Sequence, residues 1–548
     1  MLRLACRVRP LLATAFTLTW LGGVAFAQTP APPPGGSDPS QNGPPAPPPG
    51  SVVGPTTPPL QTNPLDPRTP VGPPEAPPAA GPPGSGAPAP APAPPAAAPP
   101  APVNQPIVKP TPGHTGQFEF GSYGRATPAL DGRGGPGRNA DIVAFGTRLD
   151  EDNYAELEFR RADDWTTEKD PTPITSRIVA TLAVTDPLFH YTGKFDATLA
   201  LRNLFIEEKG IGHPGLALWV GSRMYRGDDI YLLNWWPLDN LNTLGGGARL
   251  ELPSRTKLAV HAGVVRLDDP FQYQAVARPL PYNQLGATRV AIFDRPRVIS
   301  SFRAEQIFPL EGTAGIKVVG YGELHHVAKG VREREPAVYE QMPSDGGFVA
   351  GLQVGAFAGQ RDTFVNLFFR YARGLAAYGD FTAPYELADD RTSSGAHEVR
   401  VAMSANWEGG PFTVLAGGYV RSFRTAAPND LSFQNVDEAA LVVRPHYYFT
   451  DKVGVFVEGT AETQQRAVLF EGQGRPVQGT MFRAGVAPFL SPAGKGSYRR
   501  PQIRAIYLFS VRDRDARSFY PADDPFARRS TEHFVGLSCE WWFNSSYL

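Results

Sequence analysis

The chain has 548 residues, and its 52 Lys and Arg residues almost balance 53 Asp and Glu residues, giving a formal net charge of −1. This balance leaves no basic excess for nucleic acid, so we expect no nucleic-acid partner. Two cysteines exclude a disulfide-based scaffold, and a hydrophobic content of 41% argues against a polytopic helical membrane protein.

The first predicted element is an export signal, residues 1–27. Three arginines precede an uncharged run, residues 11–27, which ends in Ala25-Phe26-Ala27. A basic start, a short apolar run and small residues at the cleavage point are typical of a secretory signal peptide. A membrane anchor is the alternative, but the run is short for a span and no basic cluster follows it.

Residues 28–112 form the second predicted element, a disordered linker. This segment contains 33 of the 59 prolines and no aromatic residue. It therefore cannot bury enough apolar surface to offset the entropy of an ordered chain. Proline-rich sequence favours extended polyproline II, which suits a spacer. A role as a ligand for a partner or for the cell wall is the alternative.

Residues 113–548 alternate between apolar and polar side chains and contain no long uncharged run. Residues 363–371, 399–407 and 503–511 each alternate over about ten positions, the reach of a tilted membrane strand. Because such strands leave more than half of the segment for connections, we expect long loops on one side and short turns on the other. The segment predicts an all-β fold, a transmembrane antiparallel β-barrel of about 18 strands.

The side of each strand that faces lipid needs a separate argument, since soluble β-proteins also alternate. The chain carries an export signal, and its polar faces mix Arg and Glu with small residues. Aromatic residues near strand ends are typical of the zones where a barrel meets the membrane surface. We expect the apolar faces to meet lipid and the polar faces to line a wet lumen. The aromatic residues assigned to the surface zones are Phe159, Tyr371, Trp407, Phe423 and Phe543, and short turns are expected at residues 408–411 and 450–452.

Three of the predicted lumenal faces combine an aromatic ring with charged groups. Alternation places Tyr123 and Arg125 of the first strand inward, with Tyr154 and Glu156 of the second and Trp542 of the last. First and last strands become neighbours when a barrel closes, so these three rings should lie side by side on one wall. Sugar rings rest their apolar faces on aromatic rings while charged groups bind their hydroxyls. The alternative is that the rings only fill space.

At these residues the chain resembles the maltoporin family of sugar-specific outer-membrane porins. The matching segments are residues 118–125, 148–157, 219–229, 444–445 and 500–504, together with the Trp-rich end. The resemblance implies a passive channel for sugars or oligosaccharides that lies in outer-membrane lipid as a homotrimer. The sequence offers no cofactor or metal site and no catalytic motif, so we expect no enzymatic activity. Some sugar porins carry N-terminal periplasmic extensions, so we expect residues 28–112 in the periplasm, where cell-wall contact is open to them.

The resemblance also implies roles for single residues. It places Tyr123, Tyr154, Trp542 and Trp236 on the family's aromatic slide, a row of rings along which sugars pass. It places Arg125, Arg148, Glu156, Arg202 and Asp229 on the family's track of polar residues. Three of the positions that depart from the family pattern concern the slide and the track. Gly227 stands where a track arginine is expected, Asn234 replaces an aspartate, and Ala439 falls at a further slide tryptophan, so maltodextrin specificity does not follow.

Two alternatives to a sugar channel stay open. The first is a general diffusion porin whose lumenal aromatic residues are incidental. The second is a structural tether, with the barrel in the membrane and the proline-rich arm directed towards the cell wall. An outer-membrane enzyme is a third class, but the sequence contains neither a His-Glu-x-x-His nor a Gly-x-Ser-x-Gly motif.

Overall fold

The computed structural model describes residues 114–166, 173–185, 198–280, 286–359, 363–427, 434–470 and 473–544. The predicted signal peptide, residues 1–27, and the proline-rich segment, residues 28–112, lie outside these ranges. Strands make up most of the described chain, with a few short helices in the connections. Within the described ranges, no helix is both long and apolar enough to cross a bilayer.

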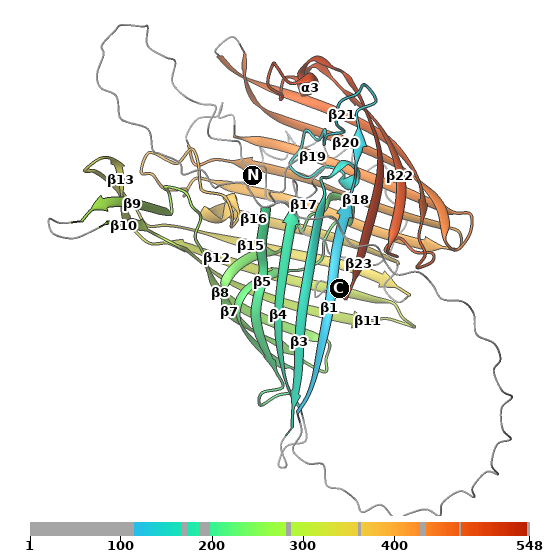
Figure 1. Ribbon diagram of the computed structural model, residues 1–548, viewed down its shortest axis with the longest axis horizontal. Coiled ribbons are helices and arrows are strands. Elements are labelled where there is room, and N and C mark those ends of the chain that lie inside the picture. The colour runs from blue at the N-terminus through green and yellow to red at the C-terminus, as the bar shows by residue number, and fades with distance from the viewer. Residues whose placement is uncertain are drawn as a thin grey trace, which may run out of the picture. The chain divides into compact units, whose positions relative to one another are not determined.

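Eighteen described strands form one closed antiparallel sheet, which confirms the predicted barrel (Figure 1). Each strand pairs with the next one along the chain, and β1 pairs with both β3 and β23. Because β1 pairs with β23, the backbone N–H and C=O groups of the first and last strands are hydrogen-bonded to each other. No strand edge is then left unpaired in lipid. The strands are β1 (His114–Ala126), β3 (Tyr154–Trp165), β4 (Ile174–Thr185), β5 (Thr198–Lys209), β6 (Leu216–Arg226), β7 (Asn240–Glu251), β8 (Thr256–Val265), β11 (Arg297–Pro309), β12 (Gly315–Val327), β15 (Asp345–Ala358), β16 (Thr363–Gly374), β17 (His397–Gly409), β18 (Phe412–Arg424), β19 (Val436–Tyr448), β20 (Val453–Phe470), β21 (Gln473–Leu490), β22 (Gln502–Arg512) and β23 (Thr531–Phe543).

The connections differ sharply between the two ends of the barrel. Short turns join β17 to β18 and β19 to β20, at the two places where the sequence predicts them. Long loops at the opposite end include residues 127–153 and 227–239. Because outer-membrane barrels have short periplasmic turns and long extracellular loops, this contrast orients the barrel. The long loops carry β2 (Ala129–Leu130), η2 (Arg148–Asp150), η4 (Tyr231–Leu233), η5 (Leu375–Tyr378), α2 (Arg514–Arg517), α3 (Pro525–Arg528) and two hairpins, β9 (Tyr273–Pro279) with β10 (Ala287–Asp294) and β13 (Gly330–Glu335) with β14 (Val338–Met342).

The turn between β17 and β18 depends on a glycine. Gly410 adopts φ of +59°, and a Cβ at this position would meet nothing within 4 Å. Gly410→Ala should therefore destabilise the barrel by about 1 kcal/mol through backbone strain alone. Gly459→Ala is the matched control, because Gly459 also has open space but lies inside a strand. Denaturant unfolding in detergent micelles measures both variants, and equal stability would contradict the prediction.

Side chains alternate across the wall as the sequence predicts. On β16, Leu367 and Phe369 are exposed on the outer face, whereas Asn366 and Arg370 are buried on the inner face. One assignment to the membrane surface is wrong. Phe423 is buried and faces inward, where its ring packs edge-on against Tyr378 at 5.4 Å between centroids. Its position near a strand end could not show which face it occupies.

The lumen is not uniformly polar, in contrast to the sequence-based expectation. Loop 227–239 folds into the barrel, and its Ile230, Leu232 and Trp235 are almost fully buried. They belong to one apolar cluster with inward-facing residues of the wall, among them Val319 of β12 and Leu415 of β18. Apolar side chains on the lumenal faces of the strands therefore pack against this loop. Strand alternation reports the direction of a side chain but not what covers it.

Candidate functional site

Three of the four predicted slide residues lie together on the wall that closes the barrel. Tyr123 of β1 and Trp542 of β23 are register partners, and the rings of Tyr123 and Tyr154 lie 5.8 Å apart between centroids. All three belong to one small apolar cluster. Tyr123 and Tyr154 are buried, whereas Trp542 is half-buried. Antiparallel closure of first strand against last produces this arrangement.

Arginines hold the two tyrosine hydroxyls of this wall. Arg148 donates to the Tyr123 hydroxyl at 2.8 Å, and Arg125 donates to the same oxygen at 3.2 Å. Arg202 donates to the Tyr154 hydroxyl at 2.6 Å. The structure thus places three predicted track residues beside two predicted slide residues. With its hydroxyl bound to guanidinium groups, each phenol ring is held in one orientation.

The predicted track residue Glu156 joins the same group. Arg202 lies 3.2 Å from the Glu156 carboxylate, and the Tyr154 hydroxyl donates to that carboxylate. Arg125 forms a second ion pair, at 3.0 Å, with Glu151 of loop 127–153. These pairs leave little freedom to the charged groups behind the aromatic rings.

Glu540 is the centre of the site, and the sequence-based list of site residues omits it. Its carboxylate accepts from Arg148 at 2.7 Å, from Arg500 at 2.7 Å and from Arg504 at 2.5 Å. Tyr231 of the inward loop donates to it at 2.8 Å. One buried carboxylate therefore joins the closing wall, β22 and loop 227–239. We define these five residues, Glu540, Arg148, Arg500, Arg504 and Tyr231, as the Glu540 cluster.

Two signals in the sequence point to this cluster. Glu540 precedes Trp542 by two positions and therefore shares its lumenal face. Arg500 lies in a motif that resembles the porin family. The structure agrees with this signal, because the Arg500 guanidinium lies 4.4 Å from the centre of the Trp542 ring. Tyr231 has no comparable signal, because a loop residue has no alternation that predicts its direction.

The remaining two predicted site residues lie in the inward loop. Trp236 is 1% exposed and lies beneath the guanidinium of Arg226, 4.1 Å from the ring centre. In this conformation its ring is not available to a solute. One carboxylate oxygen of Asp229, Oδ2, is buried and has no hydrogen-bond partner among the described residues. Asp229 interacts electrostatically with Arg148, which donates to the Tyr123 hydroxyl. Arg226, which covers Trp236, interacts in the same way with Glu156.

The departures from the family pattern have local explanations. A Cβ at Gly227 would collide with the side chains of Asp239 and Arg303, so the glycine leaves room for that ion pair. Asn234 adopts the left-handed conformation that asparagine tolerates, with φ of 48°, and its amide donates to Glu151 at 2.9 Å. The assignment of Ala439 to the slide is wrong. Ala440 is the buried, inward residue of this pair, so Ala439 faces away from the lumen.

Ion pairs fix both ends of the inward loop to the far wall. Asp228 binds Lys317 of β12 and Gln353 of β15, and Asp239 binds Arg303 of β11. Burial opposes ionisation of the Asp228 carboxyl, but Lys317 outweighs burial and lowers its pKa to about 2. Because the pKa of Asp228 is depressed, its ion pair with Lys317 is fully formed above the pKa that an ordinary carboxyl group has. The pair is lost only as the pH falls through about 2.

This anchor predicts a change in channel behaviour. Asp228→Asn removes the charge that holds Lys317, so the loop should move more and the open-channel current should become noisier. Burial raises the pKa of Asp239, the anchor at the other end of the loop, so the wild-type noise should already rise at a pH above that at which Asp228 loses its charge. Asp451→Asn, at an exposed pair with Lys495 near a short turn, is the control. Single-channel recordings with equal noise in both variants would contradict the prediction.

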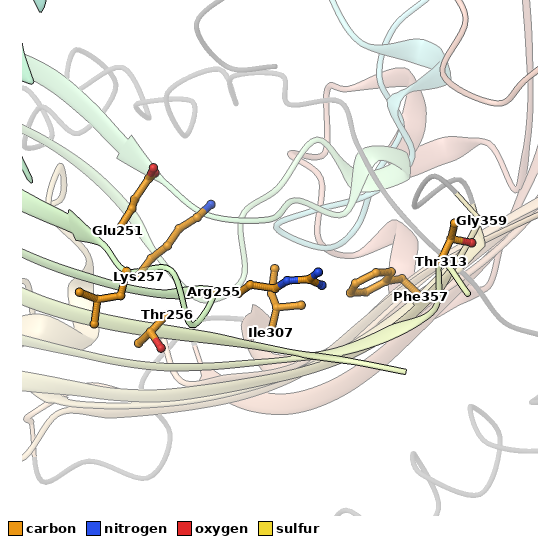
Figure 2. Close-up of a pocket in the computed structure, with 9 residues that line it drawn as sticks. Glu251, Arg255, Thr256, Lys257, Ile307, Thr313, Phe357 and Gly359 are labelled. Carbon is orange, nitrogen blue, oxygen red and sulfur yellow. The ribbon is translucent and has the colours of Figure 1, made fainter. Parts of the chain in front are cut away.

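A cavity of about 520 Å³ opens on the lumenal face at the short-turn end (Figure 2). Ile307 and Phe357 form apolar parts of its lining, and Arg255, Lys257 and Glu251 supply charge. Figure 2 shows the Arg255 side chain extending towards the Phe357 ring. An aromatic ring beside charged groups thus occurs a second time in the lumen.

The chain is similar to solved outer-membrane proteins at low sequence identity. A search of curated proteins finds no significant match. Among solved structures, the chain is similar to the outer membrane protein OpdK of Pseudomonas aeruginosa, with 12% identity and a TM-score of 0.36 over 78% of this chain and 99% of that chain. OpdK with vanillate gives 13% identity and a TM-score of 0.37 over 78% and 98%. A loop-deletion mutant of OmpT from Vibrio cholerae gives 11% identity and a TM-score of 0.34 over 78% of this chain and 99% of that chain.

The family comparison covers nearly the whole described barrel. The model of the LamB porin family matches residues 118–543, from the first strand to the last residue of β23. This range contains the closing wall, the inward loop and the Glu540 cluster. The chain belongs to the LamB porin family.

Proposed function

We propose that the protein is a passive channel for sugars or oligosaccharides. Family membership indicates a porin of the outer membrane, and this fold points to a diffusion channel rather than an enzyme. The finer assignment to sugars is supported by the residues of the closing wall. No energy source enters the proposal, because weak binding sites in series are enough to let a solute enter and leave.

The observation that carries the proposal is the position of Trp542. Its half-buried ring lies beside Tyr123, while Arg500 covers it at 4.4 Å. A sugar that rests its C–H face on the exposed part of this ring would meet charged hydrogen-bond donors at its edge. The cavity beside Phe357 supplies a second contact of the same kind nearer the short-turn end.

A general diffusion porin is the second candidate, and one observation favours it. Tyr123 and Tyr154 are only 2% and 3% exposed, so a continuous slide is not open to solute in this conformation. In that case the rings would stiffen the closing wall and solute size alone would decide passage. The proposal of sugar preference therefore depends on Trp542 more than on either tyrosine.

Two further features belong to the proposal. Resemblance to sugar porins supports a homotrimer in outer-membrane lipid. The signal peptide and the proline-rich segment predicted from the sequence support export and a periplasmic spacer. Deleting residues 28–112 would test the tether alternative. Loss of envelope integrity with normal transport would indicate that the protein acts mainly as a tether through this segment.

Block of single-channel current by neutral oligosaccharides tests the proposed function. Purified protein in a planar bilayer should show brief, concentration-dependent interruptions with oligosaccharides and fewer with a polyether of similar size. An equal response to both solutes would indicate a general diffusion porin. Oligosaccharides that never interrupt the current would end the sugar proposal.

A further inference from the structure

Three basic side chains form a row on the outer wall at the long-loop end. Register pairs Arg373 of β16 with His397 of β17, and His397 with Arg424 of β18. Neighbouring strands lie about 4.8 Å apart, so the three positions span about 10 Å. We define Arg373, His397 and Arg424 as the basic rim.

The basic rim faces outward, away from the lumen. The residues adjacent to it in sequence, Ala372, Glu398 and Phe423, are all at most 2% exposed and face inward. Alternation along each strand therefore directs the three basic side chains to the outer face.

An apolar band lies directly below the basic rim on the same strands. Phe369 of β16 and Val401 of β17 are 47% and 42% exposed on the outer face. Outward apolar residues of a membrane barrel meet lipid tails, and the apolar band ends at the headgroups. The basic rim thus lies at headgroup depth, and the long loops place it on the extracellular side.

Of the two arginines in the basic rim, only one is paired with a carboxylate that the structure describes. Arg424 pairs with Asp437 at 2.7 Å and also donates to the carbonyl oxygens of Phe423 and Val436, which leaves part of its guanidinium for an outside acceptor. No carboxylate of the described chain lies within ion-pair distance of Arg373 or His397. The Arg373 guanidinium donates to the carbonyl oxygen of Ser394 at 3.5 Å. An exposed arginine above a lipid-facing surface therefore has donors available for an acceptor outside the protein.

We propose that the basic rim binds phosphate groups of a lipid headgroup in the outer leaflet. The guanidinium fork matches two phosphate oxygens, and hydrogen bonds between ionised groups are stronger than neutral ones. A lipid carrying two phosphates about 10 Å apart would engage Arg373 and Arg424 at the same time. This inference concerns the outer wall and does not depend on the solute that the channel carries.

Binding of lipid A to the full-length protein in detergent micelles tests the proposal. The triple variant R373Q/H397Q/R424Q should bind bis-phosphorylated lipid A about tenfold more weakly than the wild type. Added salt should reduce the wild-type affinity and narrow this difference. R161Q is the control, because Arg161 is also exposed but lies on β3 near the short-turn end. It should bind like the wild type.

Three outcomes would overturn the proposal. They are an unchanged affinity of the triple variant, an equal affinity of the wild type for lipid A stripped of phosphate, and displacement of the lipid by millimolar inorganic phosphate. Retained resistance of the folded barrel to unfolding in detergent shows that the triple variant keeps its structure. The single variant R373Q removes only the least compensated charge, and it should still weaken binding measurably.

Discussion

Glu540→Gln should lower the free energy of unfolding of the barrel by about 3–5 kcal/mol. Three guanidinium groups and one phenol point at this buried carboxylate, and each of the three arginines is at most 8% exposed. Glutamine keeps the shape of the side chain but removes its charge. The variant would therefore bury three cations that lack their common counter-ion. Denaturant unfolding of the purified protein in micelles measures the loss.

A matched lumenal carboxylate provides the control for this prediction. Glu119 also faces the lumen and pairs with Arg160 at 3.0 Å, but 37% of its side chain is exposed. Glu119→Gln should cost no more than about 1 kcal/mol, because water screens an exposed pair. If both variants lose the same stability, Glu540 does not have the central role that its contacts imply.

Replacing Tyr123 and Trp542 together with alanine should weaken oligosaccharide block by about 1–3 kcal/mol, if a sugar stacks on a ring as strongly as a base does. Trp542 offers the exposed part of its ring, and Tyr123 supports it from the neighbouring strand. The measurement is the blocking constant in single-channel recordings. The double variant Tyr123→Phe with Trp542→Phe keeps the rings and should retain most of the block.

The control for this second prediction is an aromatic residue on the other face of the wall. Trp407 of β17 is half-buried on the outer surface and has no access to the lumen. Trp407→Ala should leave the blocking constant unchanged. An unchanged constant in the Tyr123 and Trp542 variant as well would remove these rings from the solute pathway.

Alternation predicted the wall of this barrel well, because each strand is constrained in the same simple way. A residue such as Leu367 must face lipid and its neighbour Asn366 must not, and no other contact changes that rule. Closure of the first strand on the last then placed Tyr123, Tyr154 and Trp542 together. Those inferences needed only the strand period and the chain order.

Residues of the inward loop could not be predicted in this way. Tyr231 reaches Glu540 across 309 positions of sequence, and Trp236 is covered by Arg226. Neither contact follows from a period, since a loop has none. The error at Ala439 has a related origin, because a match by residue type alone can be one position off and one position reverses the face.

The closing pair of strands has a consequence for assembly. Tyr123 and Tyr154 come from the first two long strands of the chain, whereas Glu540 and Trp542 come from its last strand. Tyr123 and Tyr154 can come together as soon as β1 pairs with β3, but Glu540 and Trp542 join them only when β23 meets β1. A chain that stops short of β23 lacks the carboxylate that gathers the arginines as well as the ring beside them. Any solute binding that depends on Trp542 should therefore require a completed barrel.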